Sequence, residues 1–308
     1  MNCGANAAEI RSAEVLLHVE DVCKAYGSKL VLENIDLNVR RGELCTVVGP
    51  SGCGKSTLLR LILGQERPTS GEILINGQPV GMPSPERGVV YQKYSLFPHL
   101  SVLENVVLGK KLSASFLERF RLQTQFVEDA KFYLDKMRLW EHRHKYPHEL
   151  SGGMQQRVAL AQALIMKPEI LLMDEPFGAL DPGTREHMQV FLLELWEDFG
   201  MTVFFVTHDL EEAVFLGTRI LVLSQFYSDD RGPSFGNRGA RIVADYPLAR
   251  SAASTVVKEQ AEFGKLIQDI RREGFDPDYL QHASSFNLRH SDSFQTLTPE
   301  EYDEANHR

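Results

Sequence analysis

The sequence predicts an α/β fold built around a parallel sheet. Two observations indicate it. The apolar run 44–48 leads directly into a glycine-rich segment at 49–57, GPSGCGKST. Further along, short continuous apolar runs at 170–173, 203–206 and 220–223 alternate with helical patterns, as buried parallel strands covered by helices do. Ligands of such sheets bind beyond the carboxyl ends of the strands, so the segments after these runs are candidate sites.

The segment 49–57 has the composition of a phosphate cradle. Its glycines allow tight turns that aim backbone N–H groups at phosphate oxygens, and the helix expected behind it adds the positive end of its dipole. Lys55 is placed to reach the β- and γ-phosphates, and Ser56 to hold Mg²⁺. An ordinary glycine turn would not need Lys and Ser at those positions. The candidate nucleotide-binding residues are Gly49, Pro50, Ser51, Gly52, Cys53, Gly54, Lys55, Ser56 and Thr57.

A small antiparallel lobe is expected around this loop. Alternating apolar residues at 15–19 and 35–40 predict half-buried antiparallel strands. The segment ILING at 73–77 predicts a hairpin, and a short strand at 89–91 is assigned to the same lobe. A helical insertion is expected at about 93–155, because 101–145 shows helical spacing without a strand pattern.

The main domain is expected to span residues 14–250, after a flexible segment 1–13 and before a C-terminal segment 251–308. The polar, glycine-rich stretch 225–240 predicts a loop, and a strand follows at 241–245. Residues 251–308 are expected to hold one amphipathic helix, ended by Gly274, and then a polar, unstructured tail. The apolar positions of that helix are Phe263, Leu266, Ile267 and Ile270.

Bulk properties exclude several classes of protein. The chain has 308 residues and a net charge of −9, and an acidic balance disfavours nucleic-acid and anionic-lipid partners. It contains no apolar run of about 18 residues and no signal-peptide pattern, so a cytoplasmic location is expected. The four cysteines lack zinc-site spacing. Cys53 lies where a helix dipole lowers a thiol pKa, although a residue that merely fills the position is the favoured interpretation.

Two carboxylates end the apolar run at 170–173. Asp174 is then placed to bind Mg²⁺, directly or through water, and Glu175 to orient and deprotonate an attacking water. The alternative is a helix cap, which Pro176 makes plausible. A second glycine turn, Ser151-Gly152-Gly153, opens a helix and is either an anion site or an ordinary cap. The chain already has one phosphate cradle. A second cradle therefore favours the hypothesis that two chains share each nucleotide.

LSGGMQQR at 150–157 completes a set of motifs that resembles the ATP-binding subunit of ABC transporters. The resemblance covers about residues 14–224 and implies a P-loop NTPase core with a parallel sheet, an antiparallel β lobe and a helical subdomain. It implies ATP and Mg²⁺ as cofactors and a head-to-tail homodimer, in which Ser151, Gly152 and Gly153 face the other chain's phosphate loop.

The resemblance also assigns roles to single residues. Tyr26 matches the aromatic that stacks on adenine, with a buried tyrosine as the alternative. Gln92 matches the glutamine that contacts Mg²⁺ and the attacking water. His208 matches the histidine that holds the γ-phosphate, although a histidine after a strand is more often structural. Asp181 matches a residue that crosses the dimer interface.

The segment 91–106 resembles the importer subgroup, and most closely its nitrate, sulfonate and taurine type. That resemblance implies two membrane permease subunits, an external solute-binding protein and a place on the cytoplasmic face of the bacterial inner membrane. Tyr94, Leu96, Phe97 and Pro98 would receive a helix from a permease, unless they form the core of the helical lobe. Two other functions compete: a soluble ABC ATPase that acts on nucleic acid or the ribosome, and a non-catalytic ATP-binding adaptor.

Overall fold

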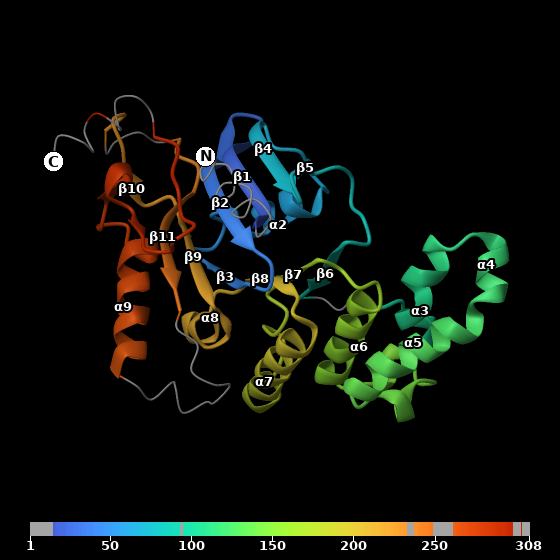
Figure 1. Cartoon of the computed structure of the whole chain (residues 1–308). Helices are drawn as coiled ribbons and strands as arrows, with labels where there is room; N and C mark the ends of the chain where they lie inside the picture. The colour runs from blue at the N-terminus through green and yellow to red at the C-terminus, as the bar shows by residue number, and fades with distance from the viewer. Residues whose placement is uncertain (1–14, 93–94, 233–236, 249–260, 298–302, 304–308) are drawn as a thin grey trace, which may run out of the picture. The chain divides into compact units, whose positions relative to one another are not determined.

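The computed structural model divides the chain into two compact units (Figure 1). One comprises the described residues up to Pro83 and those from Trp196 onward, and the other runs from Ser84 to Leu195. The residues that the structure describes are 15–92, 95–232, 237–248, 261–297 and 303. The expected flexible segment 1–13 therefore lies outside the described residues. No described helix is both long and apolar enough to cross a membrane.

An antiparallel sheet with strand order β2-β1-β4-β5 forms the lobe of the first unit. Its strands are β1 (Val15–Tyr26), β2 (Lys29–Arg40), β4 (Ser70–Ile75) and β5 (Gln78–Pro79). Both residues of the Asn-Gly turn between β4 and β5 have positive φ, as a two-residue hairpin requires. The predicted hairpin and antiparallel strands are confirmed, and β1 and β2 extend well beyond the predicted segments.

A second sheet in this unit has the order β13-β11-β9-β3-β8. Its first three strands along the chain, which are mutually parallel as predicted, are β3 (Leu44–Val48), β8 (Thr202–Val206) and β9 (Arg219–Ser224). Antiparallel β11 (Arg241–Pro247) and short β13 (Asn287–Leu288) extend it beyond β9.

The helices of the first unit pack on these strands. They are α2 (Lys55–Leu63), α8 (Leu210–Leu216) and α9 (Ala261–Phe275). Apolar side chains of α8 and α9 form one core with those of β9 and β11, and Ile220, Val222 and Ile270 lie within it.

The second unit is mainly helical and includes one parallel strand pair, β6 (Arg87–Tyr91) with β7 (Ile170–Asp174). The strand predicted at 89–91 is therefore real, but its assignment to the antiparallel lobe is wrong, because it pairs along its whole length with β7. The predicted helices are present as α3 (Val102–Ser113), α4 (Phe116–Arg121), α5 (Gln123–Lys136), α6 (Gly152–Leu164) and α7 (Pro182–Phe199), the last of which continues into the first unit.

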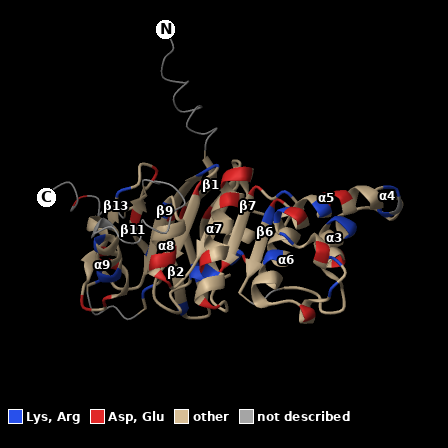
Figure 2. Cartoon of the chain, turned by 90° about the horizontal axis from the view of Figure 1, so that it is seen from below, with Lys and Arg blue, Asp and Glu red and all other residues tan. Residues whose placement is uncertain are grey.

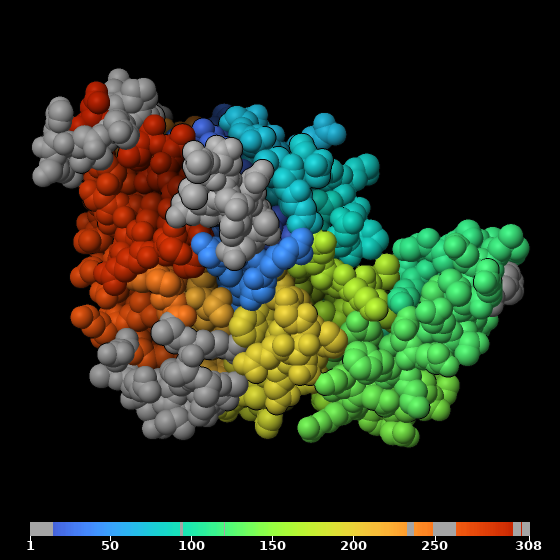
Figure 3. Space-filling view, viewed as in Figure 1, coloured from blue at the N-terminus to red at the C-terminus, as the bar shows by residue number. Residues whose placement is uncertain are grey.

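The C-terminal segment is more ordered than its polar composition predicts. Two-residue strand β10 (Tyr227–Ser228), within the expected loop, pairs with β12 (Gln281–His282). Residues 286–297 then run back along the first unit, where Asp292 pairs with Arg40 and Thr296 with Asp36. Figure 3 shows the described orange and red residues after 261 gathered into one continuous mass. The tail is folded because its polar side chains find fixed partners on β2, and Phe294 stacks on His18 of β1.

Gly274 does not end α9, which continues to Phe275. A Cβ added at Gly274 would lie 2.4 Å from Cγ1 of Val222 on β9, so this glycine lets the helix approach the sheet closely.

We expect Gly274→Ala to lower the free energy of unfolding by about 1–3 kcal/mol, because the new methyl group meets a stiff, buried valine. Gly264→Ala in the same helix is the control. Its methyl group would enter open space, and alanine is favoured over glycine in a helix by about 0.5–1 kcal/mol. Urea unfolding measures both, and equal effects of the two variants would contradict the close approach.

Candidate nucleotide site

The glycine loop joins β3 to α2, and two of its glycines have no space for a side chain. A Cβ on Gly49 would lie 2.1 Å from the carbonyl oxygen of Leu223, and one on Gly54 would lie 2.7 Å from Cδ2 of Leu32. Gly54 also caps α2 with a φ of 107°. The loop thus lies tight against its neighbours, with its backbone rather than its side chains forming the surface ahead of the helix.

Lys55 points into this loop and is only 6% exposed. Its Nζ donates to the carbonyl oxygens of Gly49, at 2.7 Å, and Pro50, at 3.0 Å. No acidic residue lies in the first turn of α2. A desolvated ammonium at the N-terminus of a helix favours an anion at this position.

The neighbouring loop positions differ in exposure. Ser51 and Gly52 are exposed, and Ser56 is half-buried. The buried Thr57 hydroxyl accepts a hydrogen bond from Arg60 at 3.2 Å. Cys53 is buried, and this burial raises the pKa of its thiol. Burial therefore outweighs any lowering of the pKa by the helix dipole, and the side chain only fills space in the packed loop.

His208 leaves the sheet beside the phosphate loop. Val47 of β3 is in register with Val206 of β8, and the Thr207 N–H donates to the Val47 carbonyl at 3.2 Å. Because the two strands are parallel, the loop after Val48 and the exposed His208 start from the same edge of the sheet.

A buried polar pair holds the turn that carries His208. The Thr207 hydroxyl donates to Glu212 at 2.5 Å and accepts from the Asp209 N–H at 3.0 Å. Asp209 in turn caps α8 by accepting from the N–H groups of Glu211 and Glu212. Sequence reasoning did not select Thr207 or Glu212, and only the run of polar residues after β8 signalled them.

In the second unit, Gln92 and the two carboxylates meet at one strand edge. Tyr91 is in register with Asp174, so Gln92 and Glu175 are the next residues on two paired parallel strands. A Cβ on Gly178 would lie 3.1 Å from Nε2 of Gln92, so the turn after Glu175 reaches the glutamine.

Glu175 itself has a φ of 47°, a left-handed conformation that is strained for a non-glycine residue and common at functional sites. The helix-cap alternative for Asp174 and Glu175 is wrong, because the next helix, α7, begins only at Pro182.

Two helix starts adjoin each other elsewhere in this unit. Ser151 caps α6 by accepting from the Met154 N–H at 3.3 Å. A Cβ on Gly153 would lie 2.6 Å from Cγ2 of Thr184. Asp181 accepts from the Thr184 N–H at 3.0 Å, and this bond lowers the pKa of the exposed Asp181 carboxyl. The exposed Ser151 and Asp181 and the half-buried Gly152 therefore lie around the buried contact of Gly153 with Thr184.

Tyr26 is 44% exposed at the end of β1, so the buried alternative is wrong. Its hydroxyl donates to Glu66 at 2.5 Å, and this hydrogen bond lowers the pKa of the Glu66 carboxyl. Lys24 lies 5.0 Å from the ring centroid. The ring is accessible for stacking, and Glu66, which no sequence motif marks, orients it.

The segment proposed to receive a permease helix is described from residue 95. Tyr94 lies outside the described residues, whereas Leu96 is half-buried and Phe97 and Pro98 are exposed. The fully buried Asn105 fixes the backbone here, since it donates to the Phe97 carbonyl and accepts from the Phe97 N–H at 2.8 Å. The core-packing alternative therefore fails for Phe97 and Pro98.

Comparison with known proteins supports one family. The ABC transporter family model matches residues 32–178. The nitrate import ATP-binding protein NrtD of Synechocystis is 49% identical over 64% of this chain and 72% of its own length. The aliphatic sulfonates import ATP-binding protein SsuB of Bacillus cereus is 40% identical over 80% of this chain and 94% of its own. This chain belongs to the ABC transporter family. The ATP-binding subunits of that family hydrolyse ATP to drive transport.

Solved structures agree on the fold. A dimeric ATP-binding cassette bound to ADP and Pi is 30% identical, with a TM-score of 0.61, over 77% of this chain and all of that one. The structure of cbiO1 from Clostridium perfringens, part of the cbiONQ complex, has a TM-score of 0.66 at 24% identity, over 84% of this chain and 95% of that one. The α/β fold predicted for an ABC ATPase is thereby confirmed.

We expect Thr207→Val to lower the ATPase rate by about 10- to 100-fold, because losing the hydroxyl shifts the turn that carries His208. Thr207→Ser keeps the hydroxyl and should retain most of the rate. Steady-state ATP hydrolysis measures both variants. Equal ATPase rates for Thr207→Val and Thr207→Ser would show that this turn does not depend on the hydrogen bond.

Proposed function

We propose that this chain is the ATP-hydrolysing subunit of an importer for a small solute such as nitrate, a sulfonate or taurine. The observation that carries the proposal is the similarity to nitrate and sulfonate import subunits over most of their lengths. The loop and strand-edge geometry supports it, since each candidate residue lies at a strand end or a helix start.

ATP would bind with its phosphates on the loop Gly49–Thr57, beside Lys55. Mg²⁺ fits the candidate donors, because a hydroxyl, an amide and a carboxylate supply only the hard oxygen ligands that this ion prefers. Those donors are Ser56, Gln92 and Asp174. Glu175 would orient and deprotonate the attacking water, and His208 would hold the γ-phosphate.

A second copy of the chain would complete each nucleotide site. The exposed Ser151 at the start of α6 offers backbone N–H groups for the partner chain's ATP, and Asp181 adjoins it across Thr184. The dimeric state of the cassette with ADP and Pi supports this homodimer. ATP binding would close the dimer and hydrolysis would reopen it, with free energy from differential binding to the two states.

Two permease subunits and a solute-binding protein would complete the importer, with this chain on the cytoplasmic face of the bacterial inner membrane. The nucleic-acid alternative is less well supported. Acidic and basic residues are interspersed along the helices of the second unit (Figure 2), unlike the basic stripe that nucleic acid requires. Affinity capture from detergent-solubilised membranes tests the choice: permease subunits in the eluate support transport, whereas RNA or DNA would support the alternative.

Glu175→Gln should retain ATP binding and lose about 10²–10³-fold in turnover, as removal of one preorganised catalytic group does. It should also accumulate an ATP-bound dimer, because hydrolysis no longer reopens it. ATPase assays and analytical ultracentrifugation with ATP measure the two effects.

Lys55→Ala is the comparison variant, since it should lose both ATP binding and turnover and remain monomeric with ATP. A wild-type hydrolysis rate in Glu175→Gln would overturn the assignment of the base.

Phe97→Ala should abolish co-purification of the permease subunits while leaving ATP binding unchanged, because the exposed ring would serve as an apolar anchor. Phe116→Ala is the matched control, since that ring is 72% exposed on the helical subdomain and Phe97 is 43% exposed. Permease recovery that falls equally in both variants would contradict a specific docking segment.

A further inference from the structure

A cluster of three side chains on the antiparallel sheet lies outside the nucleotide site. We propose that His18, Glu20 and Glu72 bind a divalent transition-metal ion, with Zn²⁺ as the representative member of that class. The three can each offer one ligand atom, and these atoms lie within 4.8 Å of one another. An imidazole with two carboxylates suits Zn²⁺, which takes three protein ligands and a water in open tetrahedral sites.

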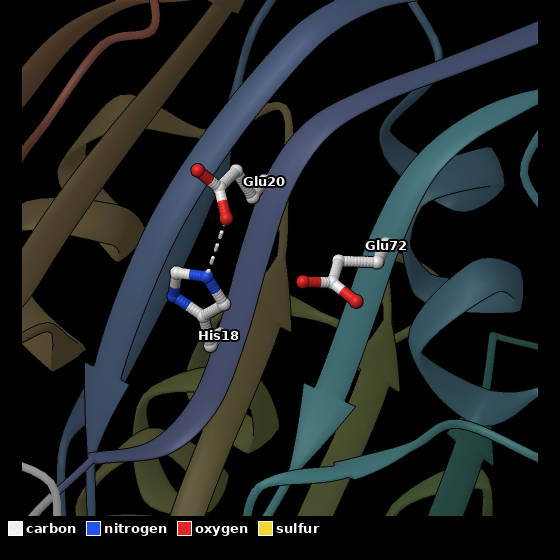
Figure 4. A group of neighbouring side chains, drawn as sticks. All are labelled: His18, Glu20 and Glu72. Atoms are coloured by element: carbon white, nitrogen blue, oxygen red, sulfur yellow. Dashed lines mark hydrogen bonds and ion pairs between the residues drawn. The ribbon is translucent and has the colours of Figure 1, made fainter.

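Strand geometry brings these ligands to one face. His18 and Glu20 are two residues apart on β1 and therefore point to the same side of the sheet. Glu72 of β4 is in register directly opposite Glu20. Figure 4 shows the Glu72 carboxylate directed from β4 toward the imidazole, with His18 joined to Glu20. A bound ion would cross-link the two strands.

The two facing carboxylates favour the binding of a cation between them. Like charges directly opposite each other on antiparallel strands destabilise the pair. Within the described part of the chain, neither Glu20 nor Glu72 forms an ion pair with a Lys or Arg side chain, and the partner of Glu20 is His18 Nε2 at 3.2 Å. A divalent ion between the carboxylates would replace this repulsion with attraction.

The imidazole is already oriented for ligation. His18 Nδ1 lies 2.6 Å from the Oδ1 atom of Asn38, its register partner on β2. With Nδ1 donating to this oxygen, Nε2 is the atom that faces Glu20, and a metal ion would take the place of the Nε2 proton between them, while Asn38 holds the ring as the outer partner of a metal-bound histidine does. Phe294 stacks on the ring with centroids 5.6 Å apart and planes at 7°. The side chain keeps 29% exposure, so an ion can reach it.

A second cluster of the same residue types provides the contrast. Glu43, His290 and Asp292 also lie within ligand distance of one another. Here, however, Arg219 pairs with Glu43 at 3.3 Å and Arg40 with Asp292 at 2.6 Å. Their guanidinium groups already neutralise both carboxylates, so this cluster is an ion-pair network and not a metal site.

Calorimetric titration of the metal-free, nucleotide-free full chain with Zn²⁺ tests the proposal. We expect one site in the wild type that Glu72→Gln and His18→Gln both lose, with Asn38→Ala binding about 10- to 100-fold more weakly. Glu43→Gln, in the ion-pair network, should bind like the wild type.

Co²⁺ substitution adds a spectroscopic readout, since a tetrahedral site gives visible absorption bands that Glu72→Gln should lack. Glu72 is exposed, so its variant should fold, and circular dichroism checks that it does. If the wild type does not bind Zn²⁺, or Glu72→Gln binds it with unchanged stoichiometry and affinity, His18 is only an ion-pair partner of Glu20 and the proposal is wrong.

Discussion

Parallel pairing in register is the constraint on which the candidate site depends. The pairing of Val47 with Val206 starts the phosphate loop and the His208 turn from one edge, and the pairing of Tyr91 with Asp174 does the same for Gln92 and Glu175. A slip of one residue would turn each following side chain to the other face of the sheet. Such a slip is disfavoured because β3, β7 and β8 are buried almost along their whole length, so their side chains would have to repack against close-packed neighbours.

Buried polar side chains next to the site hold its exposed residues in place. Thr207 and Asn105 make hydrogen bonds that fix the turns of His208 and Phe97, respectively. Glu66, which is only half-buried, also orients the ring of Tyr26 through a hydrogen bond. Because a buried polar group that loses its partner costs about 1–3 kcal/mol, these turns have few alternative conformations. The functional side chains can therefore be exposed to ligands and still keep fixed positions.

The C-terminal segment links the two sheets of the first unit. Arg219 on β9 forms paired hydrogen bonds with Asp245 on β11 and also donates to the Asn38 carbonyl on β2. Burial alone would lower the pKa of Arg219, but these partners raise it, so the guanidinium stays charged. The segment that contains Asp292 and Phe294 then crosses the lobe. Polar composition predicted a tail here, whereas matched partners far away in the sequence order it.

The sequence by itself determined the longer strands, the loop residues and the family, because apolar runs, glycine spacing and the order of motifs are local properties. Tertiary structure decided the features that depend on contacts between residues far apart in the sequence. It placed the strand at 89–91 beside β7, made Gly274 a contact residue instead of a helix end, and exposed Tyr26. It also joined His18 to Glu72 across two strands. Each of these depends on the partner opposite a residue, and pairing across long separations is a property of the folded chain alone.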